Sequence, residues 1–308
     1  MGLFGGYERA GAGIAKDAPQ KKPFFRYWEL VFRKFWKLID VNMLLMASLL
    51  PLIAAVLVIY YLLETNAGLA MLLSLALVVL GAVLFGPTVA GCTQVLRNFA
   101  KEKPCFLMET FWKAFRENFR KASVVGILDI IVGLSVVSSF KVYPELVANT
   151  GSNFYYVLFV LSLSIAITVA MMSFYAYLMI VSTDLKLGAV LKNSLALSFI
   201  ALKKNFLTLL IAVLVMGGFA FLTFLFPYFL TLLWVFLPTG FVAFMIVFNC
   251  YPVIQKYVIN PYYAQRGEVS PEASYTRTEG ENLFEDRGGK EAPVEPPKKK
   301  GKKGKVIS

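Results

Sequence analysis

A single carboxylate is the residue whose type and position could do chemistry, because Asp129 stands within an otherwise uncharged run, residues 122–140. A charged side chain deep in a bilayer is costly, so such residues usually face the interior of a helix bundle or a watery cavity. We take Asp129 as the candidate substrate-binding residue. Two other placements remain open. Asp129 follows Lys121 by about two helical turns, which would put it near the headgroups, or it pairs with a Lys or Arg across the bundle.

Other chemistry-bearing residue types are sparse. The chain has no His, which removes the commonest general base and metal ligand. Its three Cys (Cys92, Cys105 and Cys250) are far apart and have no C-x-x-C spacing, so they indicate neither a metal site nor a disulfide framework. No Walker A, HExxH or GxSxG sequence is present. We therefore expect a non-enzymatic protein with no cofactor and no metal.

Two kinds of coupling would suit a carrier. Proton-coupled carriers usually hold several buried acids or a His, whereas this chain has one acid well inside a predicted span and no His. A sodium-coupled carrier uses backbone carbonyls at a broken helix, and Gly86-Pro87 or Gly217-Gly218 could supply such a break. Gly and Pro are frequent in membrane helices in any case.

Uncharged polar residues in the apolar stretches favour packing roles over ligand binding. Amides at span ends commonly satisfy backbone groups, and hydroxyls within spans commonly pack helices together. The amides at predicted span ends are Asn42, Gln94 and Asn249, and the hydroxyls are Ser162, Ser164 and Thr168.

The chain as a whole has the composition of a membrane protein. Of its 308 residues 58% are apolar and 16% charged, whereas a soluble domain carries about 25% charge. The apolar residues form long uncharged blocks, and a bilayer core of about 30 Å needs about 20 helical residues. We predict an all-α membrane protein with six transmembrane helices, the last two separated near Pro227 because Pro ends or kinks a helix. The predicted spans are about 42–63, 69–92, 122–140, 155–181, 206–225 and 230–251.

Lys and Arg are distributed unequally between the two sides of these spans. Eight precede residue 42, seven lie in 93–121, four in 182–205 and eleven after residue 251. The intervening loops carry one, Lys141. Cytoplasmic loops carry the excess of Lys and Arg, so we expect both termini in the cytoplasm.

Each basic segment before a pair of spans has the pattern of an amphipathic helix in the headgroup plane, because aromatic residues alternate with Lys and Arg at helical spacing. These segments are 24–39, 106–121 and, more weakly, 186–204. Two of them match, since 114–119 reads AFRENF and 201–206 reads ALKKNF. We interpret the membrane domain as three repeats of an interfacial amphipathic helix plus a two-helix hairpin. The alternative is that any entry helix needs this composition.

Three regions follow: a cytoplasmic N-terminal segment with its interfacial helix at 1–41, a six-span membrane domain at 42–263 and a disordered, lysine-rich tail at 264–308. The tail is rich in Gly, Pro, Glu and Lys and cannot bury enough apolar surface to fold alone. Six Lys within 298–305 suit an anionic lipid surface, and a solvated tail without a specific partner is the alternative. No aromatic side chains interleave these Lys for base stacking, so we expect no nucleic acid partner.

Three sequence segments carry a family resemblance. They are GAGIAKDAP at 11–19 with FWKL at 35–38, GPTVAG at 86–91 and FWKAFRENF at 111–119. Over about residues 1–262 the chain resembles the YesL family, bacterial integral membrane proteins of unknown function. The most specific positions of the resemblance are Gly86, Pro87, Thr88, Phe111, Phe115, Asn118 and Phe119.

The resemblance implies a protein of the bacterial plasma membrane and no established activity. Genes of this family often accompany sugar-uptake transporters of the ATP-binding-cassette type, which implies an accessory role beside the subunits of such a transporter. We therefore expect an accessory or partner of a carbohydrate uptake system, in contact with the lipid bilayer. A secondary carrier or permease for a small solute, with a polar cavity at mid-membrane, is one alternative. A membrane-embedded sensor or regulator whose tail responds to a signal is the other.

Overall fold

The computed structural model describes residues 22–268, except for the side chains at 228–230. Helices dominate this part of the chain and no strand occurs in it. The segment 11–19 and the lysines of 298–305 lie outside the described residues. The elements, in chain order, are α1 (Pro23–Arg33), α2 (Phe35–Leu62), α3 (Ala67–Ala100), α4 (Leu107–Thr150), α5 (Phe154–Ser182), α6 (Leu187–Ile200), α7 (Leu202–Leu225), α8 (Pro227–Phe236), α9 (Thr239–Ile254), the π-helical turn η1 (Gln255–Ile259) and α10 (Asn260–Gln265).

Local sequence explains where several helices begin and end. Pro23 and Pro227 occupy the first turns of α1 and α8, where the missing N–H of proline costs nothing. The Asn66 side chain caps α3 by accepting a hydrogen bond from the Leu69 N–H at 3.0 Å. Gly151 ends α4 with a φ of 70°, a left-handed conformation that glycine adopts without strain.

Among the described residues, six helical segments are long and apolar enough to cross a bilayer, which confirms the predicted all-α fold class. A bilayer favours helices because each backbone polar group must be satisfied within its own segment. The six segments are Phe35–Leu62, Ala67–Ala100, Leu107–Thr150, Phe154–Ser182, Leu202–Leu225 and Thr231–Gln265.

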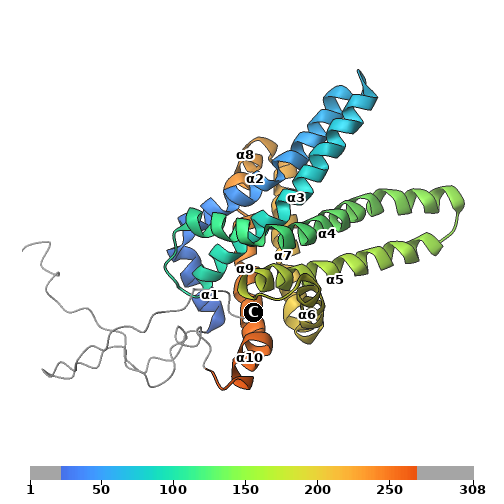
Figure 1. Cartoon of the computed structure of the whole chain (residues 1–308). Coiled ribbons are helices and arrows are strands. Elements are labelled where there is room, and N and C mark those ends of the chain that lie inside the picture. Colours follow the sequence, from blue (N-terminus) through green and yellow to red (C-terminus); the bar gives the residue numbers. More distant parts are fainter. Residues whose placement is uncertain (1–21, 269–308) are drawn as a thin grey trace, which may run out of the picture.

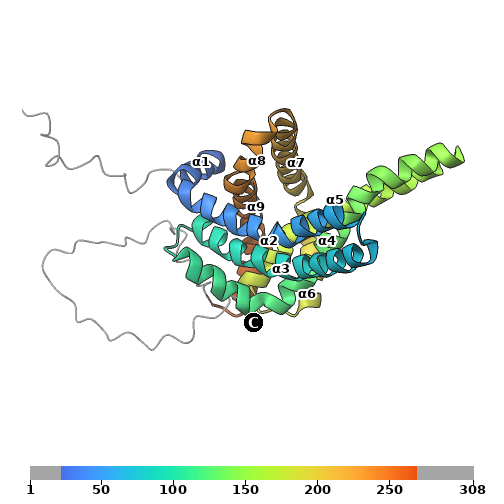
Figure 2. The ribbon, with the colours of Figure 1, turned by 90° about the horizontal axis from the view of Figure 1, so that it is seen from above.

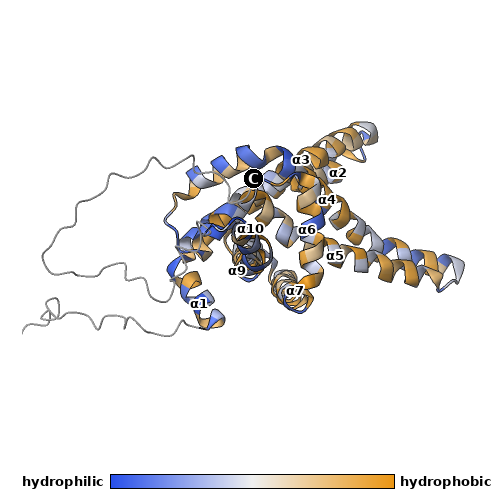
Figure 3. Ribbon diagram, turned by 60° about the horizontal axis from the view of Figure 1, so that its bottom comes forward, coloured by the Kyte–Doolittle hydropathy of each residue, from blue (hydrophilic) through white to orange (hydrophobic). Residues whose placement is uncertain are grey.

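The spans form three hairpins that diverge from one end of the molecule. Figures 1 and 2 show α2–α3, α4–α5 and α7–α8 pointing in different directions, with their tips apart. Basic residues are concentrated in segments such as α1 and the start of α4. These segments lie, with α10, at the opposite end, where the hairpins converge, which we call the basic end (Figure 1). Figure 3 shows the projecting hairpins as largely hydrophobic and the hydrophilic residues as gathered toward the basic end.

The core lies near the basic end, where the hairpins meet. The second half of α3 is its centre, because buried residues run almost continuously from Gly86 to Phe99. Helices α4, α5 and α9 pack around this segment. Among the fully buried large side chains are Leu96, Phe99, Tyr175, Phe244 and Ile254.

The three segments expected to be separate interfacial helices have two different structures. Both α1 and α6 are separate helices that precede a span. The segment 106–121 instead continues without interruption into its span, as the first part of the 44-residue α4. The matched motifs differ accordingly, because α4 runs straight through Ala114 whereas the chain breaks between α6 and α7 at Ala201.

Neither of the two dipeptides that could have broken a spanning helix does so. Helix α3 runs through Gly86-Pro87 and α7 runs through Gly217-Gly218. The sixth candidate span is interrupted instead between α8 and α9, at Leu237 and Pro238. Proline removes one backbone donor, which contributes to the interruption at this position.

Candidate functional site

Asp129 lies on α4 and faces two hydroxyl groups of α5. Ser173 Oγ donates a hydrogen bond to Asp129 Oδ1 at 2.5 Å, and Tyr177 OH donates one to Asp129 Oδ2 at 2.7 Å. Ser173 and Tyr177 are four residues apart, which places both on one face of α5. Tyr177 is 6% exposed, while Asp129 is half-buried. The carboxylate is therefore held by both of its oxygens between two helices.

The surroundings of this carboxylate are apolar and uncharged. Helix α5 contains no charged residue, and α3 contains none before Arg97. Tyr177 and Ser173 precede the end of α5 at Ser182 by five and nine residues, or about 8 and 14 Å along the helix. Asp129 thus lies well within the spanning segment, on the side nearer the basic end.

The structure bears on one of the two other placements that the sequence left open, the ion pair. Within residues 22–268 no Lys or Arg forms an ion pair with Asp129, whose hydrogen-bond partners are Ser173 and Tyr177. Lys121, two turns earlier on α4, directs its Nζ to the Leu185 carbonyl oxygen at 2.8 Å. The pairing with a cation across the bundle is therefore not found among the described residues, and the position near the headgroups stays a prediction.

Ser173 and Tyr177 were not among the residues that the sequence singled out. Both lie in an apolar, aromatic run in which several hydroxyl residues are equivalent by pattern. Of the hydroxyls that were named, Ser162 contacts Ser139 of α4 at 3.2 Å, whereas Ser164 and Thr168 have local partners. Ser164 Oγ donates to the Val160 carbonyl oxygen at 2.8 Å and Thr168 Oγ1 to that of Ser164 at 2.9 Å. A spacing of four on α5 is the one signal that could have connected Ser173 with Tyr177.

Asn42 has the most extensive hydrogen bonding of the amides at span ends. Its Nδ2 donates to the carbonyl oxygens of Trp234 and Val235 at 2.9 and 2.7 Å, and its Oδ1 accepts from the Gly240 N–H at 2.7 Å. These backbone groups flank the break between α8 and α9. Asn42 therefore satisfies groups that the break leaves without helical partners. Gln94 and Asn249 have side-chain partners, Arg97 and Thr208.

Asn205 makes a comparable link at the start of α7. Its Oδ1 accepts from Tyr175 OH at 2.5 Å, and its Nδ2 donates to the carbonyl oxygens of Leu197 and Ser198 at 3.2 and 2.9 Å. Asn118 stands at the matching position of the other motif copy, and its Nδ2 donates to the Ala114 carbonyl oxygen at 2.8 Å. Both Asn side chains are buried and bind backbone carbonyls, so their recurrence has a structural explanation.

The positions that carry the family resemblance gather where α3 crosses α4. A Cβ atom at Gly86 would collide with the backbone of Ala122, and Gly126 meets the backbone of Gly86 in the same way. Pro87 and Thr88 are buried in α3, and Thr88 Oγ1 donates to a carbonyl one turn earlier at 2.9 Å. These residues thus bring two helices into backbone contact.

The aromatic members of this set extend the same contact. The Phe111 ring covers Gly91, since a Cβ there would lie 2.6 Å from Phe111 Cδ2. Phe115 packs between Phe111 and Phe119 in a tilted and an edge-to-face contact, with ring centroids 5.9 and 5.7 Å away. Phe111 is 3% exposed. This aromatic stripe therefore faces protein at Phe111, not only the lipid headgroups expected for an interfacial helix.

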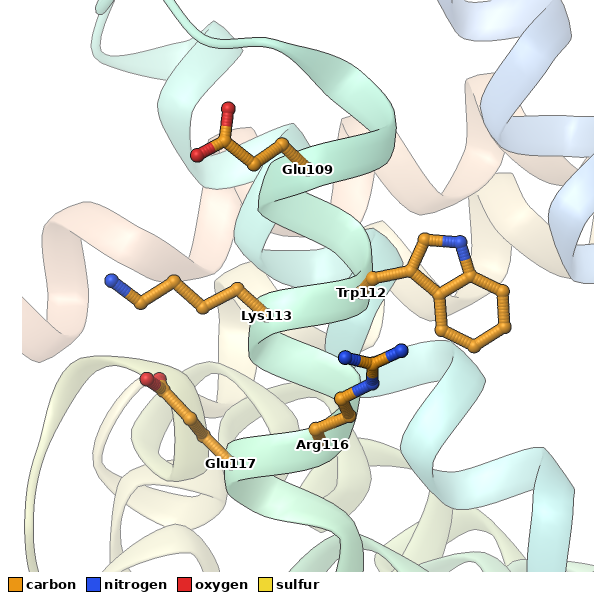
Figure 4. Close-up of a pocket in the computed structure, with 5 residues that line it drawn as sticks. All are labelled: Glu109, Trp112, Lys113, Arg116 and Glu117. Atoms are coloured by element: carbon orange, nitrogen blue, oxygen red, sulfur yellow. The ribbon is translucent and has the colours of Figure 1, made fainter.

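Two open hollows mark the surface of α4. The first, of about 430 Å³, is lined by Glu109, Trp112, Lys113, Arg116 and Glu117. Figure 4 shows Trp112 and Arg116 on one side of the helix and Lys113 and Glu117 on the other, so their polar groups do not converge. One helix supplies all five residues, which is typical of a solvated face.

The second hollow lies on the projecting part of the α4–α5 hairpin. It has a volume of about 480 Å³, and its lining combines small hydroxyl side chains with aliphatic ones. The lining residues are Ile131, Leu134, Ser135, Ser138, Ser139, Val142 and Tyr143. We call this surface the serine groove. Ser139 also meets the other helix of the hairpin, because Ser162 Oγ donates to Ser139 Oγ at 3.2 Å.

At the basic end, Glu102 holds α1 against the connection between α3 and α4. Its Oε2 accepts from Arg33 at 2.5 Å and its Oε1 from Arg26 at 3.4 Å. Partial burial would raise the pKa of Glu102, but the hydrogen bonds and charges of Arg33 and Arg26 outweigh it, and the pKa is lowered. Tyr27 adds a second contact by donating from its OH to the Phe241 carbonyl oxygen at 3.4 Å.

The arrangement offers binding and anchoring more readily than acid–base chemistry. No group of three or more His, Cys, Asp or Glu side chains lies together anywhere in residues 22–268. In the described part of the chain, Asp129 is the one acidic group held inside a span by polar partners from another helix. Its hydroxyl partners supply oxygen ligands and no general base.

Comparison with known proteins gives one match. Residues 55–140 match a family model described as "Protein of unknown function, DUF624". The matched region covers the end of α2 from Ala55, all of α3 and α4 as far as Phe140, and so includes the α3–α4 crossing described above. No curated protein and no solved structure matches the chain significantly.

Proposed function

We propose that this chain is a non-enzymatic protein of the bacterial plasma membrane that docks laterally onto the transmembrane helices of a carbohydrate uptake transporter. The observation that supports docking is the α4–α5 hairpin, which projects from the rest of the fold (Figures 1 and 2). In the most apolar part of α5 only 6% of the residues are buried. This hairpin therefore has two helices whose surfaces are covered by lipid or by another protein.

The serine groove favours a protein helix as the cover. Helices associate in membranes through small residues that allow close approach and through hydroxyls that can hydrogen-bond across the interface. Ser135 and Ser138 are small enough for close approach, and Ile131 and Leu134, which are 58% and 51% exposed, flank them. Ser135 Oγ donates within α4 to the Ile131 carbonyl oxygen at 2.8 Å, so toward a partner it can only accept. The lining is largely apolar, so a lipid tail can also fill the groove, but only a partner helix can hydrogen-bond to its hydroxyl groups.

The identity of the partner rests on the resemblance to the YesL family, whose genes often accompany sugar-uptake transporters of the ATP-binding-cassette type. The match to a family of unknown function is compatible with this proposal and adds no activity. The proposal further includes both termini in the cytoplasm. Lys and Arg are enriched in cytoplasmic loops, so the basic end would face the cytoplasm. A reporter fused after Ser308 is expected to be active in the cytoplasm and inactive when it requires export.

Site-directed photo-crosslinking in intact cells tests the docking. A photoreactive amino acid at Ser138 is expected to give a discrete adduct with a transporter membrane subunit after irradiation, and mass spectrometry of the adduct identifies it. Val137 is the matched control, because neighbouring residues of a helix are turned by about 100° from one another and Val137 is 72% exposed. The same group at Val137 is expected to leave the protein uncrosslinked.

Three results would count against the proposal. Equal crosslinking from Ser138 and Val137 would indicate random collisions in the bilayer. Adducts that contain only a second copy of this chain would assign the groove to self-association. Labelling of Ser138 by lipid alone would leave the hairpin without a protein partner.

A further inference from the structure

The cluster of Asp129, Ser173 and Tyr177 has a property that docking does not use. We propose that it is a binding site for a monovalent cation, either a proton or a sodium ion, on the carboxylate of Asp129. The site joins α4 to α5 through oxygen atoms alone, at 2.5 and 2.7 Å. It stands independently of the proposed partner.

Charge balance is the first reason for a bound cation. An ionised carboxylate in an apolar medium is very unfavourable unless a cation pairs with it or a proton neutralises it. The helices packed against α4 are α3 and α5. Neither faces the site with a charge, since α5 has no charged residue and the first charge of α3 is Arg97. Tyr177 is the one titratable side chain that α5 brings to the carboxylate.

The cations on α4 itself are too far away or otherwise engaged. Lys121 precedes Asp129 by eight residues, about 12 Å along the helix, and its Nζ is bound to the Leu185 carbonyl oxygen. Lys141 follows Asp129 by twelve residues, about 18 Å, toward the tip of the hairpin. Two hydroxyl donors ease the burial of a negative charge but do not cancel it.

Geometry limits the ligand to a small cation. Ser173 Oγ and Tyr177 OH lie on opposite oxygens of the carboxylate, so a bound ion must share or replace these short contacts. A proton on Oδ1 or Oδ2 would turn one hydroxyl from donor into acceptor. A sodium ion would find the carboxylate and two hydroxyl oxygens as ligands, which suits a hard cation. The protonated site and the sodium-bound site would both keep α4 joined to α5.

The position of the cluster gives the ion a short path. Tyr177 lies about 8 Å from the end of α5, and the charged residues Asp184 and Lys186 follow this end directly. The ion would therefore exchange with the solution on the basic side of the molecule. Occupancy would follow the proton or sodium activity of that compartment.

Carbodiimide labelling of the purified full-length protein in detergent tests this proposal without any assay of function. Dicyclohexylcarbodiimide is apolar and reacts with protonated carboxyl groups in apolar surroundings. In sodium-free, mildly acidic buffer, peptide mass spectrometry is expected to find the adduct on Asp129. Labelling is expected to fall at least tenfold in alkaline buffer. An Asp129→Asn variant should lose this adduct and keep any others.

Two further arms distinguish the ions. Protection of Asp129 by sodium chloride, with none by choline chloride, identifies sodium as a ligand. Labelling that depends on pH and ignores sodium identifies the proton. Tyr177→Phe and Ser173→Ala each remove one oxygen ligand, so sodium protection should weaken several-fold in both, whereas proton-dependent labelling should persist.

Infrared difference spectra keep the proposal falsifiable if the reagent fails to reach the site. A protonated Asp129 gives a carboxylic acid carbonyl band that Asp129→Asn lacks. No adduct in sodium-free acidic buffer, together with no such band, would mean that the carboxylate remains charged without a cation, and the proposal would be overturned.

Discussion

Gly86 of α3 and Gly126 of α4 meet backbone to backbone. The Cβ atom that any other residue would add at Gly86 collides with the Ala122 carbonyl group, and one added at Gly126 collides with the Gly86 backbone. Small residues allow this approach between membrane helices, where close packing replaces the hydrophobic effect as the source of stability. The crossing fixes the point from which the two hairpins diverge.

Gly86→Ala is therefore expected to destabilise the protein by about 1–3 kcal/mol, because the added methyl group meets backbone that cannot rotate away. Gly133→Ala on α4 is the matched control, since no atom lies within 4 Å of the added methyl group. That change should be neutral or slightly stabilising, because Ala favours helix over Gly. Thermal unfolding in detergent measures both variants. Equal midpoints would contradict the close contact.

The sequence predicted the helical class and the number of spanning segments because both follow from one-dimensional properties, hydropathy and length. Rotation of each helix about its axis does not follow from them in an almost uniformly apolar span. For this reason Asp129 could be found as an isolated charge, whereas its partners Ser173 and Tyr177 could not. The continuous α4 was missed because an amphipathic segment and an apolar one share the same helical period.

The break between α8 and α9 illustrates a second limit. Several proline positions are equivalent by sequence, and Pro51 and Pro87 both lie within continuous helices. What separates Pro238 from them is a remote amide, Asn42, that satisfies the opened backbone. Such a contact between the first and last spans cannot be read from local pattern.

Asn42→Ala should consequently cost about 2–4 kcal/mol, because three backbone groups lose their partner and a buried unsatisfied group costs about 1–3 kcal/mol. Asn42→Asp should be nearly as harmful, since it keeps the acceptor for Gly240 but turns a carboxylate oxygen toward the carbonyls of Trp234 and Val235. Hydrogen exchange of the backbone amides near Gly240 is expected to accelerate in both variants.

Asn249→Ala is the control for this experiment. Its Nδ2 has one hydrogen bond to Thr208 Oγ1 at 3.2 Å, far from the break between α8 and α9. Exchange near Gly240 should remain as slow as in the parent protein. Acceleration in the control as well would show general loosening and no special role for Asn42.

The ion pairs of Glu102 predict an acid-sensitive attachment of α1. The folded-state pKa of Glu102 is lowered, so its contribution is present above the ordinary pKa of a glutamate and is lost as pH falls through the lowered value. The pairs with Arg26 and Arg33 are partly exposed, so each is worth about 0–1 kcal/mol and weakens with salt. A spin label at Phe24, which is 66% exposed, should become more mobile in acid.

Glu102→Gln should give this mobility at neutral pH and remove its acid dependence. Glu102 also has a φ of 56°, a left-handed conformation that costs most side chains about 1 kcal/mol. Glu102→Gly should therefore unfold at a higher temperature than Glu102→Ala, although both free α1. A label that stays immobile in Glu102→Gln would show that other contacts hold α1 without the ion pairs.

Tyr27 predicts that the attachment of α1 is also lost in strong alkali. Burial raises the pKa of Tyr27 from 10.0 to about 12, and its ring stacks on Phe244 with centroids 5.6 Å apart. Because the folded-state pKa is raised, its contribution is present below the unfolded value and is lost as pH rises through about 12. The label at Phe24 should thus become mobile again in strong alkali. Tyr27→Phe keeps the stacked ring and lacks the ionisable hydroxyl, so it should delay this release; release at the same pH in both proteins would assign it to another group.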